Sequence, residues 1–163
     1  MEFVPFYTLF PELGKRETRS VTVLNHPFLP DDEYGLVELF CNKPGCDCRR
    51  VMFSIYPRSD FSKLLAVVAY GWESEQFYAD WIGNDNPRII LALQGPDLNP
   101  GSPQSPLAPA LLMLVKGLLL DEAYVDRIKR HYRMFKAAIR LQFGQRGRGK
   151  SRRRIRPSQK RKK

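Results

Sequence analysis

The chain has no acidic residue beyond Asp126, and this absence divides its 163 residues into two electrostatic parts. Residues 127–163 contain 17 of the 27 Lys and Arg residues, whereas residues 1–126 contain the other 10 together with all 17 Asp and Glu. A segment this basic repels itself and seeks a dense array of negative charge. The charge distribution therefore indicates a nucleic-acid partner, ahead of an anionic membrane or an acidic protein.

Other absences exclude whole classes of protein. No apolar run reaches the roughly 20 residues that a membrane span needs, since the longest, 107–120, contains Pro109, Lys116 and Gly117. The chain has two histidines and no P-loop, dinucleotide-binding or nucleophile-elbow motif, so we expect no enzymatic activity. Its first residues lack the basic region of a secretory signal. We therefore expect a cytoplasmic protein.

The hydrophobic content of 43% is enough for one folded domain, which we place at 1–139 and follow with a basic tail at 140–163. Short β-like runs separated by Pro, Gly, Asn and Asp predict an antiparallel sheet. These runs are 20–24, 34–41, 50–56, 64–70 and 88–93. The predicted fold class is α+β.

Helices are predicted to complete the domain. A short helix is expected at 73–82, and Ser105 and Asp121 are expected to cap two longer ones at the C-terminal end of the domain. The last helix has an apolar stripe that should face the core: Tyr124, Ile128, His131, Tyr132, Phe135 and Ile139. The tail has no hydrophobic periodicity, so we expect it to be disordered when free.

All three cysteines, Cys41, Cys46 and Cys48, lie within eight residues, where one predicted strand ends at Cys41 and another begins near Arg50. Pro44 and Gly45 in the intervening turn would let a hairpin tip direct three thiolates at one point, as a structural zinc site requires. The competing interpretation is one buried thiol and two exposed ones without metal. The spacing favours Zn²⁺ with a structural role.

Zinc needs a fourth ligand, and the sequence leaves several candidates. His26, shortly before the first hairpin strand, is the ligand that we favour, which would give a Cys3His zinc knuckle. Asp47, His131 and a cysteine of a second subunit are the alternatives. The arginine pair that follows Cys48 would either extend a nucleic-acid surface or offset the thiolate charge.

The run YGLVELFCNKPGCDCRRV, residues 34–51, resembles the core of a loosely defined group of uncharacterised bacterial proteins with a Cys-Asp-Cys-Arg motif. The later KRHYRMFK, residues 129–136, looks like the C-terminal helix of that group. Some members end in a metal-binding motif of the type found at the end of the SecA translocase, where this chain has its basic tail. The resemblance implies that the three cysteines act as a unit and brings no activity with it.

The tail alternates Arg with Gly and Ser, a composition that favours RNA over DNA because guanidinium groups also stack on unpaired bases. We predict an accessory protein of a nucleoprotein complex, with a further protein partner. The alternatives are a zinc-containing protein-interaction adaptor with a solubilising or docking tail, and a metal-dependent hydrolase built on Asp31, Asp32 and Glu33. The predicted nucleic-acid contacts are Arg127, Lys129, Arg130, Arg133, Lys136, Arg140, Arg146, Arg148, Lys150, Arg152, Arg153, Arg154, Arg156, Lys160, Arg161, Lys162 and Lys163.

Overall fold

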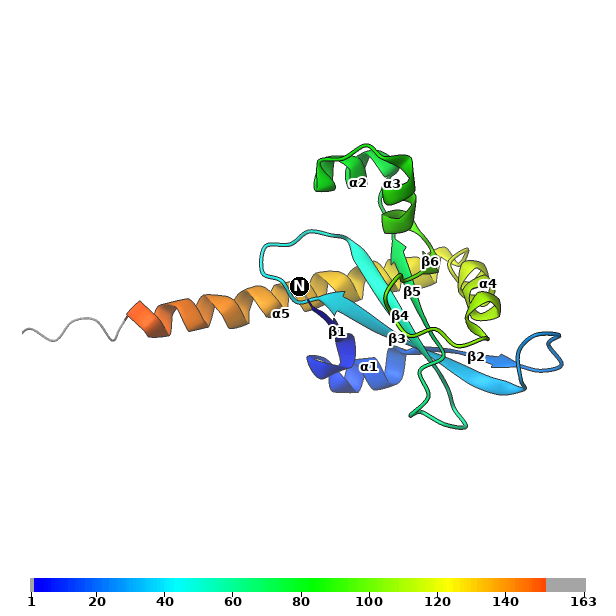
Figure 1. Cartoon of the computed structure of the whole chain (residues 1–163). Helices are drawn as coiled ribbons and strands as arrows, with labels where there is room; N and C mark the ends of the chain where they lie inside the picture. The colour runs from blue at the N-terminus through cyan, green and yellow to red at the C-terminus, as the bar shows by residue number, and fades with distance from the viewer. Residues whose placement is uncertain (1, 152–163) are drawn as a thin grey trace, which may run out of the picture.

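The computed structural model describes residues 2–151, with side chains described as far as Phe143. Its centre is an antiparallel sheet of six strands in the order β1-β3-β4-β5-β6, with β2 also paired to β3 (Figure 1). The strands are β1 (Phe3–Pro5), β2 (Arg19–Val23), β3 (Asp32–Cys41), β4 (Arg50–Pro57), β5 (Ala66–Gly71) and β6 (Asp97–Leu98). The α+β class and the antiparallel sheet are confirmed.

Strand β3 organises the sheet because it pairs along its whole length. β1 pairs with the end of β3 that leads to Cys41, β2 pairs with the end that begins at Asp32, and β4 pairs along the other edge. Alternate side chains of β3 are buried, as the period of two predicts. Glu38 is one of the buried side chains, although it is charged.

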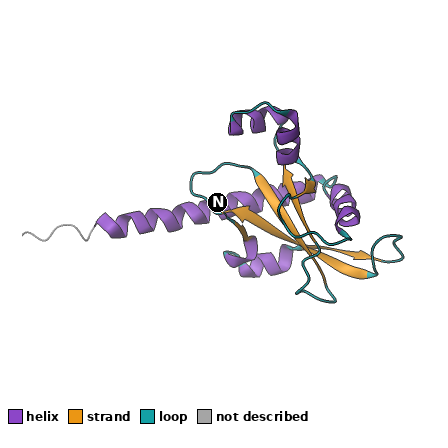
Figure 2. Ribbon diagram, in the orientation of Figure 1, coloured by secondary structure: helices purple, strands orange, loops and turns teal. Residues whose placement is uncertain are grey.

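The helices differ in which strands they cover. Helix α4 packs against β5 and β6, and α5 packs against β3 and β4. Figure 2 shows α5 crossing the sheet and continuing beyond its edge. The helices are η1 (Phe6–Thr8, a 3-10 turn), α1 (Pro11–Glu17), α2 (Glu75–Ile82), α3 (Pro87–Gln94), α4 (Ala108–Leu118) and α5 (Glu122–Ser151).

The predicted apolar stripe of α5 is confirmed. All six of its residues are buried, and Phe135 packs at 5.7 Å from the ring of Phe40 on β3. The predicted cap of this helix is also confirmed, since the Asp121 carboxylate accepts a hydrogen bond from the N–H of Ala123 at 3.1 Å. Sequence periodicity and capping chemistry therefore place α5 correctly on the sheet.

The prediction of a strand at 88–93 is wrong, because these residues form α3. Asn86 caps the helix by accepting from the N–H of Arg88, Pro87 occupies the first turn, and Gly95 follows the last residue. A short apolar run does not distinguish a strand from a helix, and here the flanking residues decide. The N-terminal elements β1, η1 and α1 were not predicted at all.

Helix α5 also differs from the prediction at its C-terminal end. It continues without a break through residue 140, where the sequence led us to place the start of the tail, and it extends to Ser151. The remainder of the predicted tail, 152–163, lies outside the described residues. Among the described residues, no helix is both long enough and apolar enough to span a bilayer.

Candidate functional site

The three cysteines converge at the turn between β3 and β4. Cys41 ends β3, Cys46 and Cys48 lie in the turn, and the three sulfur atoms are within 4.8 Å of one another. Gly45 enables the reversal of the chain because its φ of +73° is one that a side chain disfavours. The three thiols form a group that could hold a metal ion, as the spacing predicts.

A backbone hydrogen bond and burial act in opposite directions on the sulfur atoms. The backbone N–H of Lys43 lies 3.4 Å from Cys41 Sγ, in a geometry that would stabilise a thiolate. Burial raises the pKa of the Cys41 thiol and raises that of Cys48 to about 12. Without a metal, these two thiols would therefore stay protonated and react slowly as nucleophiles.

His26 is not brought to the cysteines. It lies in the loop between β2 and β3, whereas the cysteines follow the other end of β3, and Figure 1 shows the two loops at opposite ends of the sheet. The His26 Nδ1 accepts the backbone N–H groups of Phe28 and Leu29, both at 3.1 Å. A strand of ten residues spans about 30 Å, so the histidine that precedes β3 is too distant to join a site at its end.

The prediction that Lys136 lies on an exposed cationic face is wrong. It is only 4% exposed, and its ammonium group donates to the carbonyl oxygens of Cys41 at 3.0 Å and Lys43 at 2.9 Å. These carbonyls belong to the chain as it leaves β3. A buried lysine is tolerated here because the two acceptors satisfy it. The contact ties the cysteine turn to α5.

His131, another candidate ligand, is engaged elsewhere. Its Nδ1 lies 2.7 Å from the buried carboxylate of Glu38, and its Nε2 lies 2.9 Å from Glu17 of α1. A neutral imidazole can donate to only one of these carboxylates, so both hydrogen bonds require an imidazolium or a protonated carboxyl group. The ring also stacks on Phe6 at 4.2 Å. This network joins α5 to β3 and to the N-terminal segment.

Asp47, the third alternative ligand, pairs with Arg49. The Arg49 guanidinium lies 2.9 Å from Asp47 and 3.2 Å from Glu73, and this hydrogen bonding lowers the pKa of the Asp47 carboxyl. Arg50 is buried and donates to the carbonyl of Leu93 at the end of α3. The arginine pair after Cys48 therefore stabilises the fold around the turn and does not form an exposed basic surface.

The acidic cluster considered as a hydrolase site, Asp31, Asp32 and Glu33, lies at the start of β3, at the end of the sheet opposite the cysteines. Asp31 accepts from the backbone of Asn25, Asp32 from Ser59, and Glu33 from Ser20 and Arg58. The three acidic residues do not form a metal-binding group among the described residues. Their hydrogen bonds instead stabilise the ends of β2, β3 and β4.

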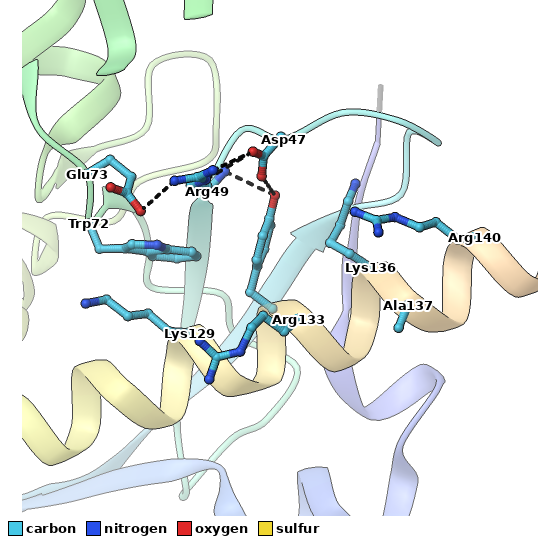
Figure 3. Close-up of a pocket in the computed structure, with 10 residues that line it drawn as sticks. Asp47, Arg49, Trp72, Glu73, Lys129, Arg133, Lys136, Ala137 and Arg140 are labelled. Atoms are coloured by element: carbon cyan, nitrogen blue, oxygen red, sulfur yellow. Dashed lines mark hydrogen bonds and ion pairs between the residues drawn. The ribbon is translucent and has the colours of Figure 1, made fainter. Parts of the chain in front are cut away.

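A cavity of about 540 Å³ lies beside the contact between the cysteine turn and α5 and is lined by residues of both. Figure 3 shows Arg49, Trp72 and Glu73 across the cavity from the helix. Trp72 is half-buried and meets the ring of Tyr132 edge to face at 5.1 Å. The helix contributes a row of residues to the opposite wall: Lys129, Tyr132, Arg133, Lys136, Ala137 and Arg140.

The predicted nucleic-acid contacts divide into several groups. Arg130 pairs with Glu17, and Arg127 lies over the Tyr124 ring at 5.2 Å. Arg133 and Arg140 are exposed at the cavity, and Lys129 is half-buried in its wall. Arg146, Arg148 and Lys150 fall on α5, but their side chains lie outside the described set. Entirely outside the described residues are Arg152, Arg153, Arg154, Arg156, Lys160, Arg161, Lys162 and Lys163.

Trp72 and the cavity were not found from the sequence. The residue follows β5 directly, and nothing in the local pattern indicates that the segment between β5 and α2 would face a helix about 60 residues later. The only available signal was the spacing of Lys129, Arg133, Lys136 and Arg140, which places them along one side of a helix.

Comparison with known proteins adds no further assignment. No protein-family model matches the chain, and neither a curated protein nor a solved structure matches it. The resemblance to bacterial Cys-Asp-Cys-Arg proteins stays a prediction. Function must therefore be argued from the residues of the site.

The network around His131 predicts a pH-dependent stability. Burial acts to raise the pKa of Glu17, but the His131 hydrogen bond and the charges of Arg130 and Arg127 outweigh it, so the pKa lies below the usual 4.5. The stabilisation is therefore complete above pH 4.5 and is lost as the pH falls through the folded-state value. We expect Glu17→Gln to lower the free energy of unfolding by about 1 kcal/mol at pH 7.

Urea unfolding of Glu17→Gln and the parent chain between pH 7 and pH 3 measures this difference. It should shrink as the pH falls. Glu12→Gln, an exposed change on the same helix, is the matched control and should have little effect at any pH. If Glu17→Gln lowered the free energy of unfolding by the same amount at every pH, the stabilising role of the Glu17 carboxylate would be contradicted.

Proposed function

We propose that this chain is a nucleic-acid-binding accessory protein that takes RNA in preference to DNA and anchors a nucleoprotein complex. The observation that carries the proposal is that several cations on α5 are not paired with acidic side chains of the fold. Among the described residues, Lys129, Arg133 and Arg140 form no ion pair and lie together along the cavity. Cations that the fold does not neutralise are available to phosphates.

The direction of α5 supports the same proposal. The helix begins with acidic residues, crosses the sheet, and continues past its edge towards the most basic part of the sequence (Figure 1). A nucleic acid on the cavity could therefore follow α5 away from the acidic body. Phosphate contacts of this kind supply affinity without selecting a sequence.

The role proposed for the cysteines is a structural zinc site. Zn²⁺ with three thiolates carries a net charge of −1, which the ammonium group of Lys136, held on the same turn, would balance. With His26 at the other end of β3, the fourth ligand has to come from elsewhere. The metal would hold the turn that supplies Asp47 and Arg49 to the cavity wall.

One observation favours the alternative of a protein-interaction adaptor. A smaller cavity of about 270 Å³ lies on the sheet where β3 and β4 meet the N-terminal segment, and it is lined by Val37, Leu39, Tyr56 and the exposed Phe61. Apolar surface of this kind is typical of protein contacts. It lies away from the α5 cations, so it suits the further protein partner of a complex equally well.

Metal binding is tested directly by Cys46→Ser. We expect the purified chain to bind one equivalent of zinc, measured by elemental analysis, and Cys46→Ser to lose it. His26→Ala is the control and should keep the metal, because His26 lies away from the three thiols. Loss of zinc from His26→Ala would contradict the arrangement described, and a zinc-free parent chain would reject the metal.

Nucleic-acid binding is tested by charge removal at the cavity. We expect Lys129→Ala/Arg133→Ala to weaken binding of single-stranded RNA and to reduce the slope of log K against log salt by about 1.4, at about 0.7 per phosphate contact. Lys15→Ala/Arg16→Ala removes the same charge from exposed positions on α1 and should change the slope little. Fluorescence anisotropy at several salt concentrations measures both.

Two outcomes would count against the proposal. If the two double variants lost RNA affinity to the same extent, binding would follow the overall charge and would not use the cavity. An absence of binding by the full chain at physiological salt would reject nucleic acid as the partner and favour the adaptor.

A further inference from the structure

The cavity beside α5 combines an aromatic ring with cations. Trp72 contributes an indole that is half-buried, and Lys129, Arg133 and Arg140 stand along the helix opposite (Figure 3). The volume of about 540 Å³ is within the range of sites that enclose a small molecule. Part of the ring packs against the edge of the hydrophobic core, and the part left open to the cavity adds an aromatic surface that phosphate neutralisation alone does not need.

The indole is held in place by a side chain of α5 that also lines the cavity. Tyr132 contacts it edge to face at 5.1 Å, and the Tyr132 hydroxyl is fixed by Asp47 and by the N–H of Arg49, both at 3.2 Å. Arg49 is in turn held by Glu73 and lies 4.6 Å from the centre of the Phe77 ring. The ring therefore meets a ligand with little loss of conformational freedom.

The cations of the cavity fall into two sets. Arg49 is neutralised by Asp47 and Glu73, and Lys136 is committed to two carbonyl oxygens. These groups shape the wall. Lys129, Arg133 and Arg140 have no ion pair within the described part of the chain, so they are the groups available to an anionic ligand.

We propose that this cavity binds one unpaired nucleotide of a single strand, with the base stacked on Trp72 and its phosphates on Lys129 and Arg133. The inference rests on the proposed nucleic-acid function and specifies its ligand. A paired base is covered on both faces by its neighbours, whereas an unpaired base can leave the strand and stack on an aromatic ring. The cavity thus selects single-stranded over duplex nucleic acid.

The two tryptophans of the chain allow a direct test. Trp81 lies on α2 and lines a different cavity, so Trp81→Phe leaves Trp72 as the single tryptophan. We expect the fluorescence of this variant to be quenched by a single-stranded RNA oligonucleotide. An abasic oligonucleotide of equal length should bind through its phosphates and leave the fluorescence unchanged.

Affinity gives the second measurement. Stacking measured by alanine substitution corresponds to about 5- to 150-fold in affinity, so Trp72→Leu should weaken single-strand binding by at least about 5-fold and duplex binding by less than about 2-fold. Leucine keeps apolar contact with Tyr132 but cannot stack on a base. Circular dichroism of the variant verifies its fold.

Each contrary outcome has a distinct meaning. Binding detected by anisotropy without quenching, or equal quenching by the abasic strand, overturns the base site and leaves the proposed function standing. If a free mononucleotide quenches the fluorescence and binds as tightly as the oligonucleotide, the ligand is not a nucleotide within a single-stranded nucleic acid. No binding of any oligonucleotide rejects the inference together with the function on which it rests.

Discussion

The register of α5 on the sheet depends on two buried contacts of charged side chains between the helix and β3 with its following turn. Glu38 of β3 meets His131, and Lys136 meets the carbonyl groups of the cysteine turn. Breaking a buried charged contact costs several kcal/mol, because the remaining charge is left without a partner. A shift of α5 by one turn, about 5.4 Å, would break both contacts at once. The helix therefore has one favourable position.

That position determines what the rest of the helix presents. With His131 and Lys136 turned inward, Lys129 and Arg133 line the cavity opposite Trp72, and Arg140 stands at its end. The same lysine holds the turn that carries the cysteines, so the candidate metal site, the cavity and the helix share one set of contacts. In our account, a metal ion in the turn stabilises the wall of the nucleotide site.

The sequence predicts the parts of the fold that follow from periodicity. β3 alternates, α5 carries a stripe, and Asp121 caps it, each as expected. The sequence does not predict which charged side chains are buried. Lys136 is a cation on the same helix as the exposed Arg133, and its burial depends on the carbonyl oxygens at the end of β3 that accept its ammonium group. The prediction of His26 as a ligand is wrong for a different reason: His26 and Cys41 are close in the sequence, but a ten-residue strand places them at opposite ends of the sheet.

Crosslinking tests the central claim that a nucleic acid lies in the cavity lined by Trp72 and α5. The full chain would be mixed with a single-stranded RNA containing photoreactive uridines, irradiated and digested, and the modified peptides would be identified by mass spectrometry. We expect crosslinks to Trp72 and to the stretch of α5 that contains Arg133 and Arg140. Crosslinks confined to the loop between β2 and β3, or to residues beyond 143, would contradict the account.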